Sequence, residues 1–109
     1  MSFSGPFLRG CVYGATLTHI GTEKYFLVVS NNIRNRQLGT ALVVRRTTTA
    51  KPRLESIVAL ADGEAFVGSV LCDDILELYA DEVTRDLGAL SRSAMDRVEL
   101  GLAAALDLK

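Results

Sequence analysis

The chain has 109 residues, of which 49% are hydrophobic and 23% are charged, and its formal net charge is −1. This is the size and balance of one compact domain that can bury a core without disulfides or metal, so residues 1–109 are interpreted as a single domain. No apolar run is long enough to cross a bilayer, and the N-terminus lacks the basic start and apolar stretch of a signal peptide, so we expect a cytoplasmic protein that makes no membrane contact.

The charges are segregated along the chain. Residues 1–54 hold eight lysine and arginine side chains and one carboxylate, whereas residues 55–109 hold four such cations and twelve carboxylates. The surfaces of soluble proteins usually mix the two signs. The basic first half therefore predicts an anionic partner on one face of the molecule.

Residue types that bind metals are few in this chain. Cys11 and Cys72 stand far apart in apolar surroundings, and we interpret them as buried, reduced thiols rather than as a disulfide. His19 is the single histidine, and there is no CxxC or HxxxH pattern. The sequence predicts no metal site and no cofactor.

The first half of the chain has the pattern of β-strands. Segments 10–17 ("GCVYGATL") and 24–30 ("KYFLVVS") are rich in β-branched and aromatic residues. Segment 31–39 carries Asn, Arg and Gly, which is typical of a loop or a single helical turn. Segment 40–48 ("TALVVRRTT") is the next predicted strand.

The second half predicts short strands followed by a helix. Strands are expected at 55–60, 65–72 and 75–80, with a turn at "ADGE" between the first two. Helical spacing follows, carried by Met95, Val98, Leu102, Ala105 and Leu106. Five or six short strands and one helix indicate an α+β domain with a small curled sheet.

The predicted C-terminal helix has recognisable features along its length. Ser91 or Ser93 is expected to cap its first turn, because a serine oxygen can accept from a free backbone N–H there. Gly101 interrupts the helix at a cost of about 1 kcal/mol relative to Ala. We expect its narrow apolar stripe to pack on the sheet or on a second copy of the chain.

The stretch "VVRRTTTAKP", residues 43–52, runs from apolar residues into cations and hydroxyls. Because alternate residues of a strand point to opposite faces, Arg45 and Thr47 share one face while Arg46 and Thr48 share the other. A guanidinium beside a hydroxyl suits a phosphate oxygen. The alternative is an ordinary edge strand that ends in charges to block pairing.

Five segments occur in an order that points to one protein family. They are "RGCVYGATL", "FLVVSNN" followed by "RN", "ALVVRRTTT", "VGSVLCDDI" and "LGALSRSAMDRVELGLAAALDL". Together, over residues 9–108, they resemble the MazF/PemK toxins of bacterial toxin–antitoxin pairs. The resemblance implies an α+β fold in which a small SH3-like β-barrel of five to seven short strands is followed by a C-terminal helix, usually in a homodimer.

The same resemblance implies an activity and two partners. Family members are mostly metal-independent endoribonucleases that cleave single-stranded RNA at short sequences. The 2′-hydroxyl of the RNA attacks the adjacent phosphate and leaves a cyclic phosphate and a 5′-hydroxyl. The RNA groove is blocked by a cognate antitoxin protein.

The family pattern also implies catalytic residues. Thr47 matches the family's threonine at the end of the third strand, and Arg45 precedes it on the same face. Lys24-Tyr25 stand where the family has an Arg-Pro pair whose arginine is catalytic, and the loop before them is short. His19 lies in that loop and is the side chain that titrates naturally near pH 7. The predicted catalytic residues are therefore Thr47, Lys24, Arg45 and His19.

Further polar residues are candidates for the RNA path. Asparagine amides can contact base edges and cations can contact phosphates. The predicted RNA-binding residues are Asn31, Asn32, Arg34, Arg36, Arg46, Thr48, Lys51 and Arg53. Glu23 and Asp73 are additional candidates for acid–base work, and Tyr25 is a candidate for base stacking.

Two other functions fit a chain of this kind. One is a toxin of the same fold that inhibits DNA gyrase without being an enzyme. The other is a barrel that has lost catalysis and binds only RNA or its antitoxin. The arginine–threonine cluster favours the endoribonuclease, because a gyrase inhibitor has no use for a phosphate-binding groove.

Overall fold

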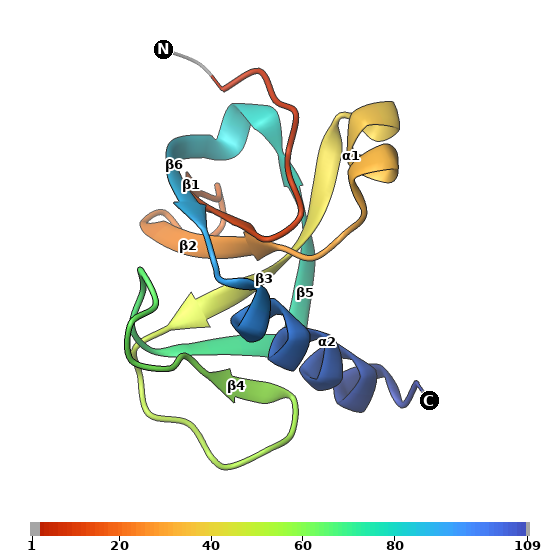
Figure 1. Cartoon of the computed structure of the whole chain (residues 1–109). Helices are drawn as coiled ribbons and strands as arrows, with labels where there is room; N and C mark the ends of the chain where they lie inside the picture. The colour runs from red at the N-terminus through yellow and green to blue at the C-terminus, as the bar shows by residue number, and fades with distance from the viewer. Residues whose placement is uncertain (1–2, 109) are drawn as a thin grey trace.

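The computed structural model describes residues 3–108, which form one open, curled sheet with two helices (Figure 1). All strand pairs are antiparallel, and the strand order is β4-β5-β3-β2-β1-β6. Within the described residues the outer strands β4 and β6 do not pair with each other. The predicted α+β fold, a barrel-like sheet followed by a helix, is confirmed. The elements are β1 (Cys11–Thr16), β2 (Glu23–Val28), α1 (Asn32–Leu38), β3 (Thr40–Thr47), β4 (Ile57–Ala59), β5 (Ser69–Tyr79), a 3₁₀ turn (Ala80–Glu82), β6 (Val83–Ala89) and α2 (Arg92–Leu106).

The curled sheet separates two clusters of buried side chains. Alternation along β2 sends Phe26 and Val28 into one cluster and Leu27 into the other. Along β3, Val43 joins the cluster of Phe26 and Val44 joins that of Leu27. The N-terminal segment contributes to the first cluster and α2 to the second, so both faces of the central strands are covered (Figure 1).

Strand β5 bends where β3 leaves the core. Val44 pairs with Ile75, but the next residue, Arg45, pairs with Leu71. The residues between, 72–74, therefore form a bulge opposite β3, and bulges bend a strand and increase its twist. The first part of β5, residues 69–71, pairs with β3 on one side and with β4 on the other, whereas its second part pairs with β3 alone. The bulge marks the level at which β3 changes from valines to arginines.

Three elements differ from the sequence prediction. The prediction of two strands over 65–72 and 75–80 was wrong, because the bulge keeps its residues extended and β5 runs without a break. Segment 31–39 is not a loop or single turn but the helix α1, capped at both ends. The strand β6 was not predicted, because it is an exposed edge strand without apolar alternation.

The C-terminal helix packs on the sheet, which is one of the two predicted arrangements. Of the two candidate caps, Ser91 is the one used, and its side chain accepts from the backbone N–H of Ala94. Gly101 does not break the helix. It is buried where α2 meets β4 and β5, and an added Cβ would lie 2.8 Å from Cys72 Sγ and 2.8 Å from Val58 Cγ2. The glycine therefore allows a close approach of helix to sheet.

We expect Gly101→Ala to destabilise the fold despite alanine's better helix propensity. Overpacking a core costs about 1–3 kcal/mol, and the helix preference returns about 1 kcal/mol. The free energy of unfolding, measured by urea denaturation, should fall by up to about 2 kcal/mol. The cost should shrink in a Val58→Ala background, where space is available for the new methyl group. A stabilised Gly101→Ala protein would contradict the close contact.

Candidate functional site

A polar hollow of about 290 Å³ lies where β3 ends. Four cationic side chains and a run of threonine hydroxyls face one carboxylate in it, so the hollow is rich in hydrogen-bond donors. Such a site suits a phosphate group better than an apolar ligand. Its lining residues are Glu23, Lys24, Tyr25, Arg45, Arg46, Thr47, Thr48, Thr49 and Lys51.

The pairing of β2 with β3 brings the principal donors together. Phe26 pairs with Arg45, and residues paired across antiparallel strands share a face. Continuing that register by two residues places Lys24 beside Thr47 on the same face. Below Arg45 on β3, Val43 is fully buried, so the donors begin where the core ends. The predicted sharing of a face by Arg45 and Thr47 agrees with this register.

Arg45 is held in the hollow by the bulge of β5. Its Nε lies 3.7 Å from Oδ2 of Asp74, and about 30% of its side chain is exposed. This distance is long for a charge-assisted hydrogen bond, so the pair orients the guanidinium without saturating it. The remaining N–H groups can donate to an anion.

Thr47 is the last residue of β3, and its side chain already has one backbone partner. Its Oγ1 accepts from the backbone N–H of Thr49 at 3.1 Å. This contact fixes the hydroxyl oxygen in the mouth of the hollow and leaves the hydroxyl proton free to point at an incoming oxygen. Thr47 thus offers a positioned neutral donor next to the cations.

The opposite face of the same strands carries a stacked network. The guanidinium of Arg46 lies over the ring of Tyr25, 4.4 Å from its centroid, and donates to the carbonyl of Val67 at 3.2 Å. Arg85, from β6, donates to the Tyr25 hydroxyl at 2.9 Å. Tyr25 is therefore engaged by two arginines, and the ring face beneath Arg46 is not free to stack on a base.

Glu23 is anchored to β6 rather than free for proton transfer. Arg85 forms a bidentate pair with it, with N–O distances of 2.6 and 3.1 Å, and the hydroxyl of Thr84 also donates to it. The hydrogen bond from Arg85, and then that from Thr84, holds the pKa of the Glu23 carboxyl below its usual range. A carboxylate with a lowered pKa is a weaker base, so Glu23 suits positioning better than proton abstraction.

The residues around α1 lie at the other end of β3 and serve the fold. Asn31 caps α1 by accepting from the backbone N–H of Arg34, and Asn32 Oδ1 accepts from the backbone N–H of Arg9. The guanidinium of Arg34 donates to the carbonyl of Thr40 at 2.8 Å and pairs with Glu77. Three of the predicted RNA-binding residues are thus engaged in local contacts away from the hollow.

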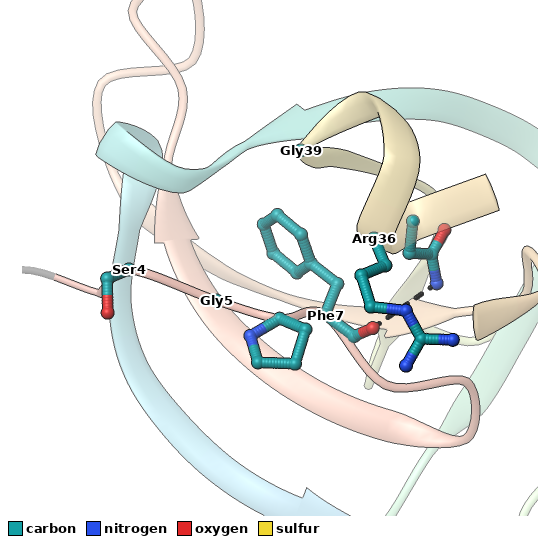
Figure 2. Close-up of a pocket in the computed structure, with 7 residues that line it drawn as sticks. Ser4, Gly5, Phe7, Arg36 and Gly39 are labelled. Carbon is teal, nitrogen blue, oxygen red and sulfur yellow. Dashed lines mark hydrogen bonds between the residues drawn. The ribbon is translucent and has the colours of Figure 1, made fainter. Parts of the chain in front are cut away.

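Arg36 lines a separate hollow of about 300 Å³ between α1 and the N-terminal segment. Figure 2 shows Arg36 beside Phe7, Gly39 and the chain at Ser4 and Gly5.

Of the twelve residues that the sequence predicts for the site, six line the polar hollow at the end of β3 and six do not. Those in the hollow are Lys24, Arg45, Arg46, Thr47, Thr48 and Lys51; those outside its lining are His19, Asn31, Asn32, Arg34, Arg36 and Arg53.

Sequence reasoning missed one residue that lines the hollow, Thr49, and one that holds its lining residues Glu23 and Tyr25, Arg85. Thr49 was not a candidate, although it continues the threonine run and its N–H positions Thr47. Arg85 was not a candidate either, because it comes from the unpredicted strand β6. A glutamate and an arginine sixty-two positions apart carry no local signal of their pairing.

The family described as "PemK-like, MazF-like toxin of type II toxin-antitoxin system" matches residues 8–106. The chain belongs to this family. It is 37% identical over 101 residues to Endoribonuclease MazF1 of Mycobacterium bovis and to Endoribonuclease MazF4 of Mycobacterium tuberculosis, covering 93% of this chain and 93% of each relative. A structure described as "Endoribonuclease in complex with its cognate antitoxin from Mycobacterial species" superposes with a TM-score of 0.86 at 36% identity, covering 94% of this chain and 97% of that one. The resemblance seen in the sequence is confirmed.

Three remaining observations concern thiols, membranes and metals. Cys11 and Cys72 are both free, and burial raises the pKa of the Cys72 thiol to about 11. Cys72 is buried as expected, whereas Cys11 is only half-buried. Among residues 3–108 no helix is long and apolar enough to cross a membrane. Over the same residues, no three His, Cys, Asp or Glu side chains gather in a way that could hold a metal ion.

Proposed function

We propose that this chain is the toxin of a bacterial toxin–antitoxin pair and an endoribonuclease that cleaves single-stranded RNA. The single observation that carries the proposal is the donor-rich hollow at the end of β3, in a chain whose relatives named above are endoribonucleases. A hollow lined by Lys24, Arg45, Arg46 and Lys51 binds a phosphate diester, and RNA supplies both that group and its own nucleophile.

The hollow can stabilise the charge that develops in the reaction. In the cleavage step the 2′-oxygen forms a bond to the adjacent phosphorus, the bond to the 5′-oxygen breaks, and a cyclic phosphate and a 5′-hydroxyl result. The 2′-hydroxyl gives up one proton to water, and the 5′-oxygen gains one. Arg45 and Thr47 donate to the phosphate oxygens, and each such donor is worth about 10²–10³ in rate. Lys24, the cation beside Thr47, protonates the 5′-oxygen.

The proposed partners follow from the relatives. The mycobacterial endoribonuclease of similar structure is described as bound to its cognate antitoxin, and MazF of Deinococcus radiodurans, similar in fold, is described in complex with MazE. We infer that this chain is likewise bound by an antitoxin, that two copies form a homodimer, and that it acts in the cytoplasm on cellular RNA.

The test is to incubate purified protein with total RNA in EDTA and to examine the new ends. Cleavage in EDTA, with 5′ ends that polynucleotide kinase labels without prior phosphatase treatment, is the expected result. Intact RNA together with inhibition of DNA gyrase would replace this proposal by the gyrase toxin. RNA binding without cleavage would replace it by the degenerate barrel.

A further inference from the structure

A second, smaller hollow of about 200 Å³ adjoins the first. It is lined by Tyr25, Arg46 and residues 65–67 of the loop between β4 and β5. Tyr25 and Arg46 line both hollows, so one surface leads from the phosphate donors into the smaller recess. A chain with alternating phosphates and planar groups could occupy both at once.

The recess is lined by two aromatic rings, a guanidinium and two aliphatic side chains. The guanidinium carbon of Arg46 lies over the Tyr25 ring, 4.4 Å from its centroid, and Phe66 meets the Tyr25 ring edge to face with centroids 6.1 Å apart. Val67 stands at the mouth with 72% of its surface exposed. Unpaired RNA bases are commonly bound by stacking on aromatic rings or on arginine planes, with apolar side chains beside them.

The loop that forms the recess is fixed against the candidate catalytic strand. At Gly68 an added Cβ would lie 2.2 Å from the carbonyl oxygen of Thr47, so the two backbones are in direct contact. Arg46 Nη1 donates to the carbonyl of Val67 at 3.2 Å. The recess therefore keeps a constant position relative to Thr47, which is what a subsite that sets the cleavage register requires.

Arg46 is not fully satisfied by these contacts. Its Nε is buried and has no hydrogen-bond partner within the described part of the chain. Buried donors in proteins are nearly always paired, so an unpaired one calls for an explanation. Stacking does not pair this N–H, because it lies in the guanidinium plane; the observation shows that the fold does not use every hydrogen bond that Arg46 can make.

We propose that this recess binds the unpaired base next to the cleaved phosphate and so contributes to the sequence preference of cleavage. The base stacks on the Arg46 guanidinium, whose other face rests on Tyr25, and Phe66 and Val67 form the apolar wall. The proposal rests on the proposed RNA-cleaving function and adds the residues that select one base. Because the walls are stacking planes and aliphatic side chains, selection here depends on the shape and stacking of the base.

The first test compares Arg46→Lys and Val67→Ser with the wild-type protein on RNA whose cut sites have been mapped. The lysine keeps the charge but loses the plane, and the serine removes the exposed apolar wall. We expect KM to rise about 10-fold or more in both variants, kcat to change little in Val67→Ser, and the preference to flatten at one base next to the cut only. Leu100→Ser, an equally exposed apolar position on α2, is the matched control.

Two outcomes would overturn the subsite. One is an unchanged base preference in both variants. The other is an equal loss of kcat on every substrate, because this is the result expected if Arg46 and Val67 only support the fold.

A second readout does not require cleavage, so it separates failure of the subsite from failure of the proposed function. In a series of short RNAs, each RNA carries one fluorescent 2-aminopurine deoxynucleotide, and its position moves by one nucleotide from one RNA to the next. Stacking in the recess should quench the fluorescence at one position with the wild-type protein and less with Arg46→Lys. If the protein quenches the probe at one position but cleaves no unmodified RNA, the base site is retained and the enzyme is rejected. If quenching does not depend on the position, the base site is rejected.

Discussion

Replacing Thr47 by valine should lower the rate of RNA cleavage by about 10²–10³, the usual loss when one fixed donor to a developing oxyanion is removed. Valine keeps the branched shape of threonine, so β3 and its pairing are retained and only the hydroxyl disappears. The oxygen of this hydroxyl accepts from the Thr49 N–H. In the valine variant the phosphate therefore loses the hydrogen bond that the hydroxyl proton would donate to it. Thr47→Ser, which keeps the hydroxyl, should retain most of the activity.

Arg45→Ala should show a loss of similar size for a related reason. The guanidinium is only loosely paired with Asp74, and both side chains are partly exposed, so its removal leaves no buried charge behind. The double variant Thr47→Val with Arg45→Ala should lose less than the product of the two single losses, because both donors act on one phosphate.

Single-turnover cleavage of a short RNA, with circular dichroism to verify folding, measures both variants. Arg92→Ala on α2 is the control for removal of a cation distant from the hollow. Wild-type rates in both Thr47→Val and Arg45→Ala would show that the catalytic site lies elsewhere.

Much of the fold is visible in the sequence because it depends on local periodicity. The period of two along β3 correctly separates Val43 from Val44 into opposite cores and places Arg45 with Thr47. The bend of β5 is not visible, because the bulge exists only relative to the partner strand β3. The edge strand β6 is not visible either, since an exposed strand of mixed polar residues needs no alternation.

Of the predicted site residues, those at the end of β3 line the hollow, whereas those around α1 do not. The sequence predicts one RNA path along the basic segment from Asn31 to Arg53, but β3 divides this segment into two parts. An eight-residue strand is roughly 23 Å long, so residues before and after it cannot meet the same phosphate. Asn31, capping α1, and Arg34, bonded to Thr40, belong to the far end. Sequence alone gives charge and order, whereas pairing decides which charges converge.

The contact between Gly68 and Thr47 predicts the second large effect. Gly68 has a φ of 107°, which residues with a side chain rarely adopt. A Cβ added to it would lie 2.2 Å from the Thr47 carbonyl oxygen, so only glycine leaves room for that carbonyl. In Gly68→Ala the backbone strain costs about 1–3 kcal/mol, and the collision adds to it because a backbone atom cannot rotate away. Either the loop between β4 and β5 or the end of β3 must move, and both carry the candidate site.

Gly63 in the same loop provides a matched control. Its φ is 92°, but nothing lies within 4 Å of its added Cβ, so Gly63→Ala carries the strain without the collision. Urea denaturation should show a larger loss of stability for Gly68→Ala than for Gly63→Ala. At a temperature where both are folded by circular dichroism, Gly63→Ala should still cleave RNA and Gly68→Ala should lose most of its activity. Equal stability and equal cleavage in the two variants would mean that the end of β3 does not depend on this contact. That result would also contradict a fixed distance between the recess and Thr47.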